Sequence, residues 1–200
     1  MKNPVSSPAE TVDEGLVFQF GIERDTKVLT MRYAVSNQAA IPAYILDQLW
    51  GFDVESLPVV DKHKAYISFG EDGIVKIGLF IHPLPTMKSV YLSIVPYAHV
   101  LRPGESRKVE LAFSLPIAEY NPYYWPTDSS KWQTKKASGV QLWIGYFMSQ
   151  EDMSVQTTTI DDAYEVRYPG IMRSTKVWKS PVIACDLMVR QRQDLFERFD

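Results

Sequence analysis

The chain has 200 residues, of which 46% are hydrophobic and 22% are charged, and its formal net charge is −3 at pH 7. This length suits one large globular domain, and this composition is that of a soluble protein with a substantial core. The slightly negative charge offers no general attraction for nucleic acid or anionic lipid, so we expect neither nucleic acid nor a membrane as a partner.

Residues 1–15 contain proline, serine, threonine and acidic residues but few bulky apolar side chains. Such a composition is typical of a flexible arm that precedes a folded domain. The arm lacks the apolar stretch of a secretion signal, and the chain has no run of about 18 apolar residues that could span a membrane. Together with the single cysteine, Cys185, these features favour a cytoplasmic protein.

A period of two in hydrophobicity begins at Leu16 and predicts β-strands with one buried face. Alternating apolar and polar residues mark two expected early strands, at 16–23 and 29–36. A third strand is expected at 43–50, where apolar residues occupy both faces, and residues 51–63 have the composition of a loop.

The clearest hairpin pattern lies between two alternating runs at 65–69 and 75–81. Asp72 and Gly73 separate the runs, and an Asp-Gly pair in this position favours a tight turn. A Pro-Gly turn then precedes another alternating strand at 109–115.

Residues 16–190 are expected to form a single domain, which is followed by a C-terminal tail at 191–200. In this tail Leu195, Phe196 and Phe199 have the spacing of one helical face, which is compatible with a short helix.

The whole pattern contains about nine or ten short strands, with turns roughly every 8–12 residues and no long helix. It predicts an all-β fold, namely an antiparallel β-sandwich of the immunoglobulin or fibronectin type. The order of the segments LTMRYAVSN, LRPGESRKVELAF and VQLWIGYF resembles that of immunoglobulin-like domains, although the chain lacks their pair of core cysteines. The resemblance is architectural and implies no particular function.

The densest chemical feature is the sequence YNPYYWPTDSSKW at 120–132, within a long insertion that we expect at 116–139 and call the aromatic loop. Its five rings belong to Tyr120, Tyr123, Tyr124, Trp125 and Trp132. Tyrosine and tryptophan are enriched at binding hot spots, so we predict that these residues form a binding surface. The alternative is that the loop folds back and its rings cap one end of the sandwich. A mixture is expected, with some rings anchoring the loop and others exposed.

The rings suggest three functions. We expect first a non-enzymatic binding module or adaptor that uses the aromatic loop to engage a protein partner or a second copy of itself. One alternative is a structural subunit of a larger assembly, joined through residues 1–15 and an edge strand. A further alternative is a carbohydrate-binding domain, because flat rings stack on sugar faces and Asn121, Asp128 and Gln133 supply polar groups.

The other chemistry-bearing residues form no recognisable set. The three histidines are His63, His82 and His99. They lie in or beside expected loops without the close spacing of a metal site. Acidic pairs at 151–152 and 161–162 do not follow a calcium-loop pattern, and Cys185 lies in an apolar strand as a buried thiol. With no nucleotide, nucleophile-elbow or zinc-protease motif, we predict no enzymatic activity, no metal and no cofactor.

One strand, expected at 140–148, carries large apolar residues on both faces. Trp143 and Phe147 lie opposite the face of Leu142 and Ile144. This pattern indicates either a strand that is buried on both sides or a second face that serves as an interface.

Overall fold

The structure is a computed structural model, and it describes residues 3–4, 9–55, 57–61, 63–90, 94–127, 131–151, 153–160, 162–167, 171–195 and 197–199. Within these residues the fold is all-β, as the alternating hydrophobicity predicted. The one helix among them, α1 (Ile171–Ser174), is a single turn. No helix in these ranges is long and apolar enough to cross a membrane.

The smaller of two main sheets has five strands: β1 (Asn3–Pro4), β2 (Ala9–Asp13), β3 (Leu16–Arg24), β4 (Val28–Asn37) and β11 (Ser106–Ser114). β3 pairs with β4 and β4 pairs with β11, whereas β1 and β2 share the free edge of β3. All of these pairs are antiparallel, as predicted.

The larger sheet has ten strands: β5 (Ala43–Gln48), β8 (Tyr66–Phe69), β9 (Ile74–Leu79), β10 (Tyr97–Leu101), β12 (Ile117–Ala118), β13 (Trp132–Met148), β14 (Ser154–Thr157), β15 (Tyr164–Arg167), β16 (Lys176–Lys179) and β17 (Ile183–Arg192). The long strand β13 lies at its centre, with β16 and β17 along one edge and β5 and β9 along the other. Because β13 pairs with β9 and β12 with β17 in parallel, this sheet is mixed and not purely antiparallel as we expected.

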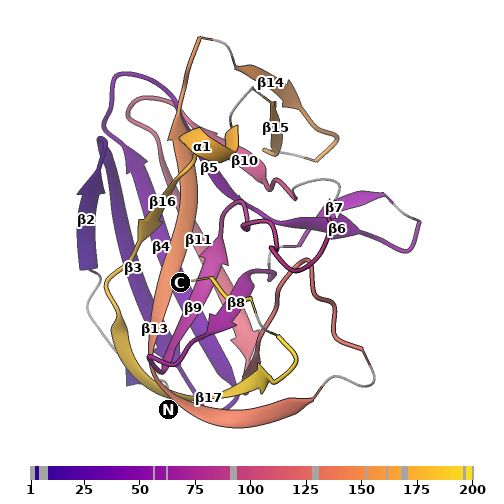
Figure 1. Ribbon diagram of the computed structural model, residues 1–200. Helices are drawn as coiled ribbons and strands as arrows, with labels where there is room; N and C mark the ends of the chain where they lie inside the picture. Colours follow the sequence, from indigo (N-terminus) through magenta and orange to yellow (C-terminus); the bar gives the residue numbers. More distant parts are fainter. Residues whose placement is uncertain are drawn as a thin grey trace.

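The two main sheets pack face to face and share one hydrophobic core (Figure 1). Between them, the ring of Phe18 in β3 is stacked on Trp178 in β16 at a centroid distance of 4.4 Å, and Tyr146 in β13 lies 5.8 Å away. The inward residues of β3 are buried and alternate with more exposed ones, which is the pattern that identified this strand in the sequence. Trp143 and Phe147 are both buried, so β13 is covered on both faces.

A short third sheet forms a projecting hairpin, although we expected residues 51–63 to be a loop. Its strands are β6 (Trp50–Phe52) and β7 (Pro58–Val60), which pair antiparallel. The hairpin extends from one side of the molecule (Figure 1). Asp53 closes its turn, since its Oδ1 accepts backbone hydrogen bonds from Glu55 and Leu57.

The N-terminal arm was expected to be flexible over residues 1–15, but its described part is paired. Residues 9–13 form β2, which lies along β3 in register from Ala9 opposite Phe20 to Asp13 opposite Leu16. The hydroxyl of Thr11 also accepts a hydrogen bond of 2.8 Å from the Trp178 indole. This strand is held by main-chain hydrogen bonds to β3 and not by buried side chains, so its polar composition did not indicate a strand.

The C-terminal tail was expected to be compatible with a helix, but residues 193–195 and 197–199 are not helical. β17 continues to Arg192. The segment after it is irregular, and the side chains of Leu195 and Phe199 are both buried. Phe199 packs edge-on against Phe80 at 5.1 Å. Phe196 lies outside the described residues.

The aromatic loop is shorter than the predicted range of 116–139. β12 covers residues 117–118, and β13 already begins at Trp132, so the connection between them is 119–131. Residues 133–136 are polar and exposed, and together with Trp132 they are held in the sheet by pairing with β17. Without a buried face, this part of β13 carries no alternation that a sequence could reveal.

Candidate functional site

The aromatic segment, residues 120–125, lies where the chain passes over the larger sheet. Tyr120 is fixed by two backbone hydrogen bonds of 2.9 Å to Ile67 in β8. The side-chain oxygen of Asn121 accepts a hydrogen bond of 2.9 Å from the backbone amide of Tyr123. Pro122 restricts the backbone between these two residues. The sequence Tyr-Asn-Pro-Tyr therefore makes a turn that sends consecutive rings in different directions.

Two of the predicted rings anchor the segment. Tyr123 is only 5% exposed, and its ring meets His82 edge-on at 5.7 Å. Its hydroxyl accepts a hydrogen bond of 3.1 Å from the Ile94 amide. Tyr124 is half-buried, and its hydroxyl donates to Glu197 Oε2 at 2.6 Å. Tyr123 and Tyr124 thus serve the fold.

Glu197 joins the anchored rings to a second loop. Its Oε1 accepts hydrogen bonds from the Thr86 amide at 2.6 Å, the Thr86 hydroxyl and the Met87 amide at 3.1 Å. The hydrogen bond from the Thr86 hydroxyl, followed by that from Tyr124, lowers the pKa of the Glu197 carboxyl to about 2. Desolvation, followed by the hydrogen bond to Glu197, raises the pKa of Tyr124 to about 12. The carboxylate is therefore ionised and the phenol neutral at physiological pH.

A buried ion pair lies beneath the segment. The Glu119 side chain is fully buried, and its carboxylate accepts hydrogen bonds from Arg198 Nε at 2.6 Å and from Arg198 Nη2 at 3.0 Å. The same carboxylate accepts hydrogen bonds from the backbone amides of Phe69 at 3.0 Å and Arg192 at 2.6 Å. Because every carboxylate oxygen is satisfied, this charge is tolerated in the interior and ties β8, β17 and the C-terminal residues together.

The other two rings of the segment face outward. Trp125 is 64% exposed and stands edge-on to Tyr120 at 5.9 Å. Tyr120 in turn stacks on the buried Tyr66 at 6.2 Å. The Lys64 ammonium lies over both outer rings, 5.3 Å from the Tyr120 centroid and 5.7 Å from that of Trp125.

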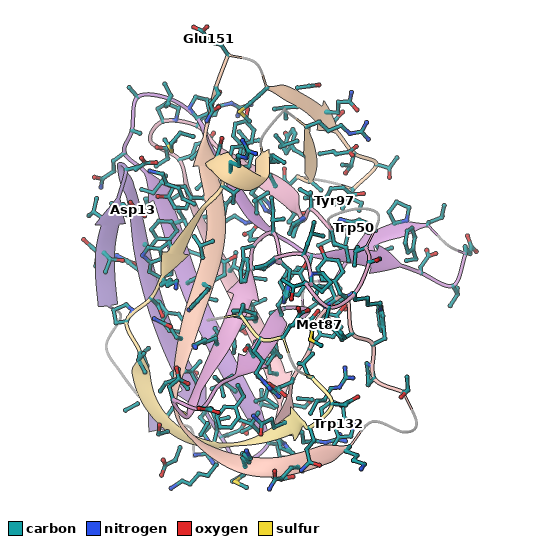
Figure 2. The ribbon with its side chains drawn as sticks, viewed as in Figure 1. Asp13, Trp50, Met87, Tyr97, Trp132 and Glu151 are labelled. Atoms are coloured by element: carbon teal, nitrogen blue, oxygen red, sulfur yellow. The ribbon has the colours of Figure 1, made fainter. Side chains whose placement is uncertain are left out.

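These outer rings form one wall of an aromatic groove of about 460 Å³. Its opposite wall is the β6–β7 hairpin, which contributes Trp50, Phe52 and Val59. Trp50 is fixed by its indole hydrogen bond to the Val95 carbonyl at 2.8 Å and by stacking on Tyr97 at 5.9 Å (Figure 2). The groove is thus bounded by flat rings that the scaffold holds in place.

Trp132 does not belong to this surface. It is the first residue of β13, and Figure 2 shows it well below Trp50 in that view. There the guanidinium groups of Arg190 and Arg192 lie 4.8 Å and 5.9 Å from its ring. The fold therefore brings together four of the five predicted ring residues and separates the fifth.

The hairpin supplies site residues that the sequence did not indicate. The exposed apolar side chains on it are Phe52 (66%), Val54 (102%), Leu57 (55%) and Val59 (38%). Their only sequence signal is a set of apolar residues spaced through WGFDVESLPVV, between acidic residues and a proline.

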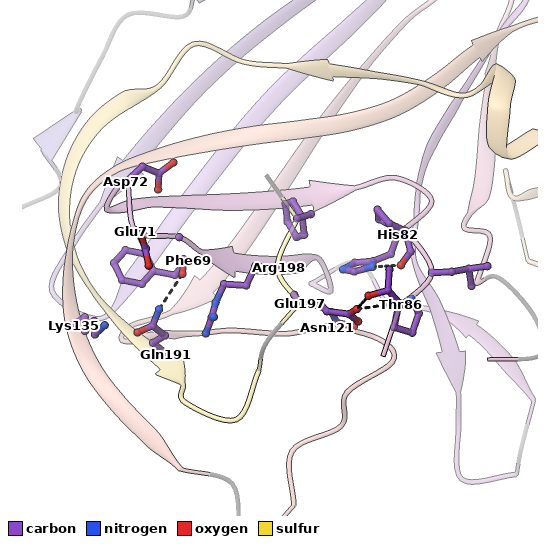
Figure 3. Close-up of a pocket in the computed structure, with 15 residues that line it drawn as sticks. Phe69, Glu71, Asp72, His82, Thr86, Asn121, Lys135, Gln191, Glu197 and Arg198 are labelled. Atoms are coloured by element: carbon purple, nitrogen blue, oxygen red, sulfur yellow. Dashed lines mark hydrogen bonds between the residues drawn. The ribbon is translucent and has the colours of Figure 1, made fainter. Parts of the chain in front are cut away.

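A polar cleft of about 790 Å³ is lined by His82, against which Tyr123 packs, and by Glu197, to which Tyr124 donates (Figure 3). Figure 3 shows Glu71, Lys135 and Gln191 toward one end, His82 and Glu197 toward the other, and Arg198 between them. The C-terminal residues 197–199 form part of its lining.

The three histidines and Cys185, which the sequence also singled out, lie in separate surroundings. His99 Nδ1 lies 2.9 Å from Asp47 Oδ1, His63 is exposed, and His82 belongs to the aromatic core. Across the described ranges, no three His, Cys, Asp or Glu side chains are grouped to hold a metal ion. Burial raises the pKa of the Cys185 thiol, which therefore stays protonated.

Comparison of the chain with protein-family models found no match, and neither did comparisons with curated proteins and with solved structures.

Proposed function

We propose that this protein is a non-enzymatic binding module that docks another protein on the aromatic groove and the β6–β7 hairpin. The observation that carries the proposal is the exposed apolar surface that these elements share. Trp125 is 64% exposed on one wall of the groove, and Phe52 is 66% exposed on the other. Exposed apolar side chains gathered in one place are characteristic of interaction sites, whereas single ones are common on any surface.

The aliphatic part of this surface favours a protein partner over a sugar. A saccharide would use the flat rings and nearby polar groups, but it offers no complement to Val54 or Leu57 at the hairpin tip. An apolar protein surface complements both the rings and the aliphatic side chains.

The scaffold also reduces the entropic cost of binding. Tyr120 is held by its backbone bonds to Ile67, and Trp125 rests edge-on against Tyr120. Trp50 is held by its bond to the Val95 carbonyl. Rings that are fixed before association lose little freedom when a partner binds, so more of the contact energy contributes to affinity.

The test compares variants of the full chain. Trp125→Ala and Phe52→Ala should each abolish or strongly weaken an interaction that affinity capture and quantitative binding detect with the unmodified protein. Met188→Ala is the matched control, because Met188 is 45% exposed but lies in β17, outside the groove. A partner that binds all three variants equally well would contradict the proposal.

Self-association is the second candidate, as in a structural subunit of a larger assembly. β11 supports it, since within the described residues this strand pairs only with β4 and leaves a long, regular edge. Light scattering over a range of concentrations tests this candidate, and a constant monomer mass would remove it. The immunoglobulin or fibronectin type likewise stays our proposal for the fold, supported by the two face-to-face sheets.

A further inference from the structure

The strand β11 leaves one long edge of the smaller sheet open. Among the residues that the structure describes, β11 pairs only with β4, in an unbroken antiparallel register from Ser106 opposite Ser36 to Ser114 opposite Val28. An open edge presents amide and carbonyl groups that can pair with a further strand. The order of charges along β11 indicates which strand fits this edge.

The pairing with β4 determines which backbone groups of β11 point to the open edge. At one end of the pair, the Glu105 carbonyl accepts a hydrogen bond of 2.9 Å from the Asn37 amide. At the other end, the Leu115 amide donates one of 2.7 Å to the Lys27 carbonyl. In an antiparallel pair, residues that bond to the neighbour alternate with residues whose groups point away from it. The odd-numbered residues of β11 therefore bond to β4, and the amides and carbonyls of the even-numbered residues face the open edge.

The side chains of β11 alternate in the same way between the two faces of the sheet. Lys108 and Glu110 are exposed on the outer face. On the inner face Leu111 and Phe113 are buried, whereas Val109 packs against the core and is only partly buried. The open edge therefore leaves some apolar surface at Val109 that a further strand would cover.

These positions select one register for a second copy of β11. Two copies that pair antiparallel about a twofold axis must match even-numbered residues with even-numbered ones, since only these face the open edge. An axis at Lys108 or at Glu110 would place identical charges opposite each other, which is destabilising. An axis at Arg107 or Leu111 would leave both charges without a counterpart directly opposite. An axis at Val109 places Lys108 opposite the partner's Glu110 and Glu110 opposite the partner's Lys108.

The neighbouring strands continue this alternation of charge across the outer face. Arg32 of β4 lies directly opposite Glu110, and its Nε is 2.6 Å from Glu110 Oε2. Arg32 also lies 2.7 Å from Glu23 of β3. Lys108 is exposed and forms no ion pair with another described residue. The partner's Lys108 would extend the row of Glu23, Arg32 and Glu110, so that Glu110 has a cation on each side.

We propose that two copies of this chain associate through their β11 edges, antiparallel about a twofold axis at Val109, so that the two smaller sheets form one continuous sheet. A lysine in the middle of an edge strand opposes pairing with most strands, and here it favours one that offers a carboxylate in the opposite position. The inference rests on self-association, the second function proposed above, and not on docking at the aromatic groove.

Charge reversal in the full chain tests this interface. Analytical ultracentrifugation over a range of concentrations at low ionic strength should show a monomer–dimer equilibrium for the unmodified chain. Lys108→Glu and Glu110→Lys each place two sets of like charges opposite one another, so each should weaken dimerisation about tenfold or more. An equal mixture of the two variants should form a dimer again, because one chain then carries two carboxylates where the other carries two ammonium groups. A variant that fails to fold would not show this recovery.

Matched controls separate this interface from other surfaces. Lys135→Glu reverses an exposed lysine in β13, outside β11, and should leave the dimer unchanged. Trp125→Ala should also leave it unchanged, so failure of docking at the aromatic groove is distinguishable from failure of this interface. A chain that stays monomeric at every concentration overturns both self-association and the β11 interface. A dimer that Lys108→Glu forms as tightly as the unmodified chain, or a mixture of variants that stays monomeric, overturns the β11 interface alone.

Discussion

The hydroxyl of Tyr124 donates a hydrogen bond of 2.6 Å to the carboxylate of Glu197, across 73 positions of the sequence. Through it the aromatic segment is joined to the C-terminal residues, and Glu197 extends the link to Thr86 and Met87. Three segments that are distant in the sequence therefore depend on one ionised carboxylate, and its protonation should loosen all of them.

Acid should expose this dependence. The folded pKa of Glu197 is about 2, below its ordinary value of 4.5, so the folded state favours the ionised form. Its stabilising contribution is complete above pH 4.5 and is lost as the pH falls toward 2. Urea unfolding at several pH values should show a smaller loss of stability over this window for Glu197→Gln than for the unmodified chain. Equal slopes for the two proteins would contradict this role of Glu197.

The fold could be predicted from sequence where burial leaves a pattern. Phe18 and Phe20 face the core while Gln19 is exposed, and this alternation identified β3. β2 and the first residues of β13 carry no such pattern, because main-chain bonds to a neighbouring strand hold them. The same reason explains why the β6–β7 hairpin was expected to be a loop.

The density of aromatic residues in the sequence indicated a candidate site, but it did not show which of the rings are exposed. Tyr123 and Trp125 are two positions apart and chemically similar, yet one is 5% exposed and the other 64%. Tyr123 is buried because His82 and Ile94, both from a distant part of the chain, surround it. No local feature of the sequence reports such contacts, and the same applies to the opposite wall of the groove at Phe52.

Removing the Glu119 carboxylate should strongly destabilise the fold. Glu119→Ala leaves the Arg198 guanidinium and the amides of Phe69 and Arg192 without their buried partner. Breaking a buried pair from one side costs about 3–5 kcal/mol, and we expect the lower end because Arg198 is partly accessible. Chemical denaturation measures this loss.

A surface pair provides the control for Glu119. Glu105 and Arg102 lie 3.4 Å apart, with side chains that are 44% and 73% exposed. Glu105→Ala should lower the free energy of unfolding by about 1 kcal/mol or less, because water screens this pair. Similar losses for Glu105→Ala and Glu119→Ala would show that the Glu119 pair is not structurally important.

His82 should make the protein less stable in mildly acidic solution. Burial lowers its folded pKa below 6.5, so as the pH falls through 6.5 the unfolded chain takes up a proton that the folded chain does not. Stability therefore declines until the pH reaches the folded pKa, below which both states are protonated. In urea unfolding between pH 8 and pH 5, His82→Phe should lose less stability than the unmodified chain. A steeper decline for His82→Phe would contradict the assignment of a neutral imidazole.

The division of the rings into anchors and exposed contacts yields the sharpest comparison. Tyr123→Ala removes a buried ring that packs on His82 and should lower the free energy of unfolding by about 3–5 kcal/mol. Trp125→Ala removes an exposed ring and should change it by no more than about 0.5–1 kcal/mol.

Binding should respond in the opposite order. Under conditions in which both variants are folded, as judged by circular dichroism, Trp125→Ala should lose the protein partner, because its ring forms a wall of the aromatic groove. Tyr123→Ala should retain partial binding, since its ring faces His82 and not the groove. If Trp125→Ala instead unfolds the protein, the ring is part of the core and the outer wall of the groove is not a docking surface.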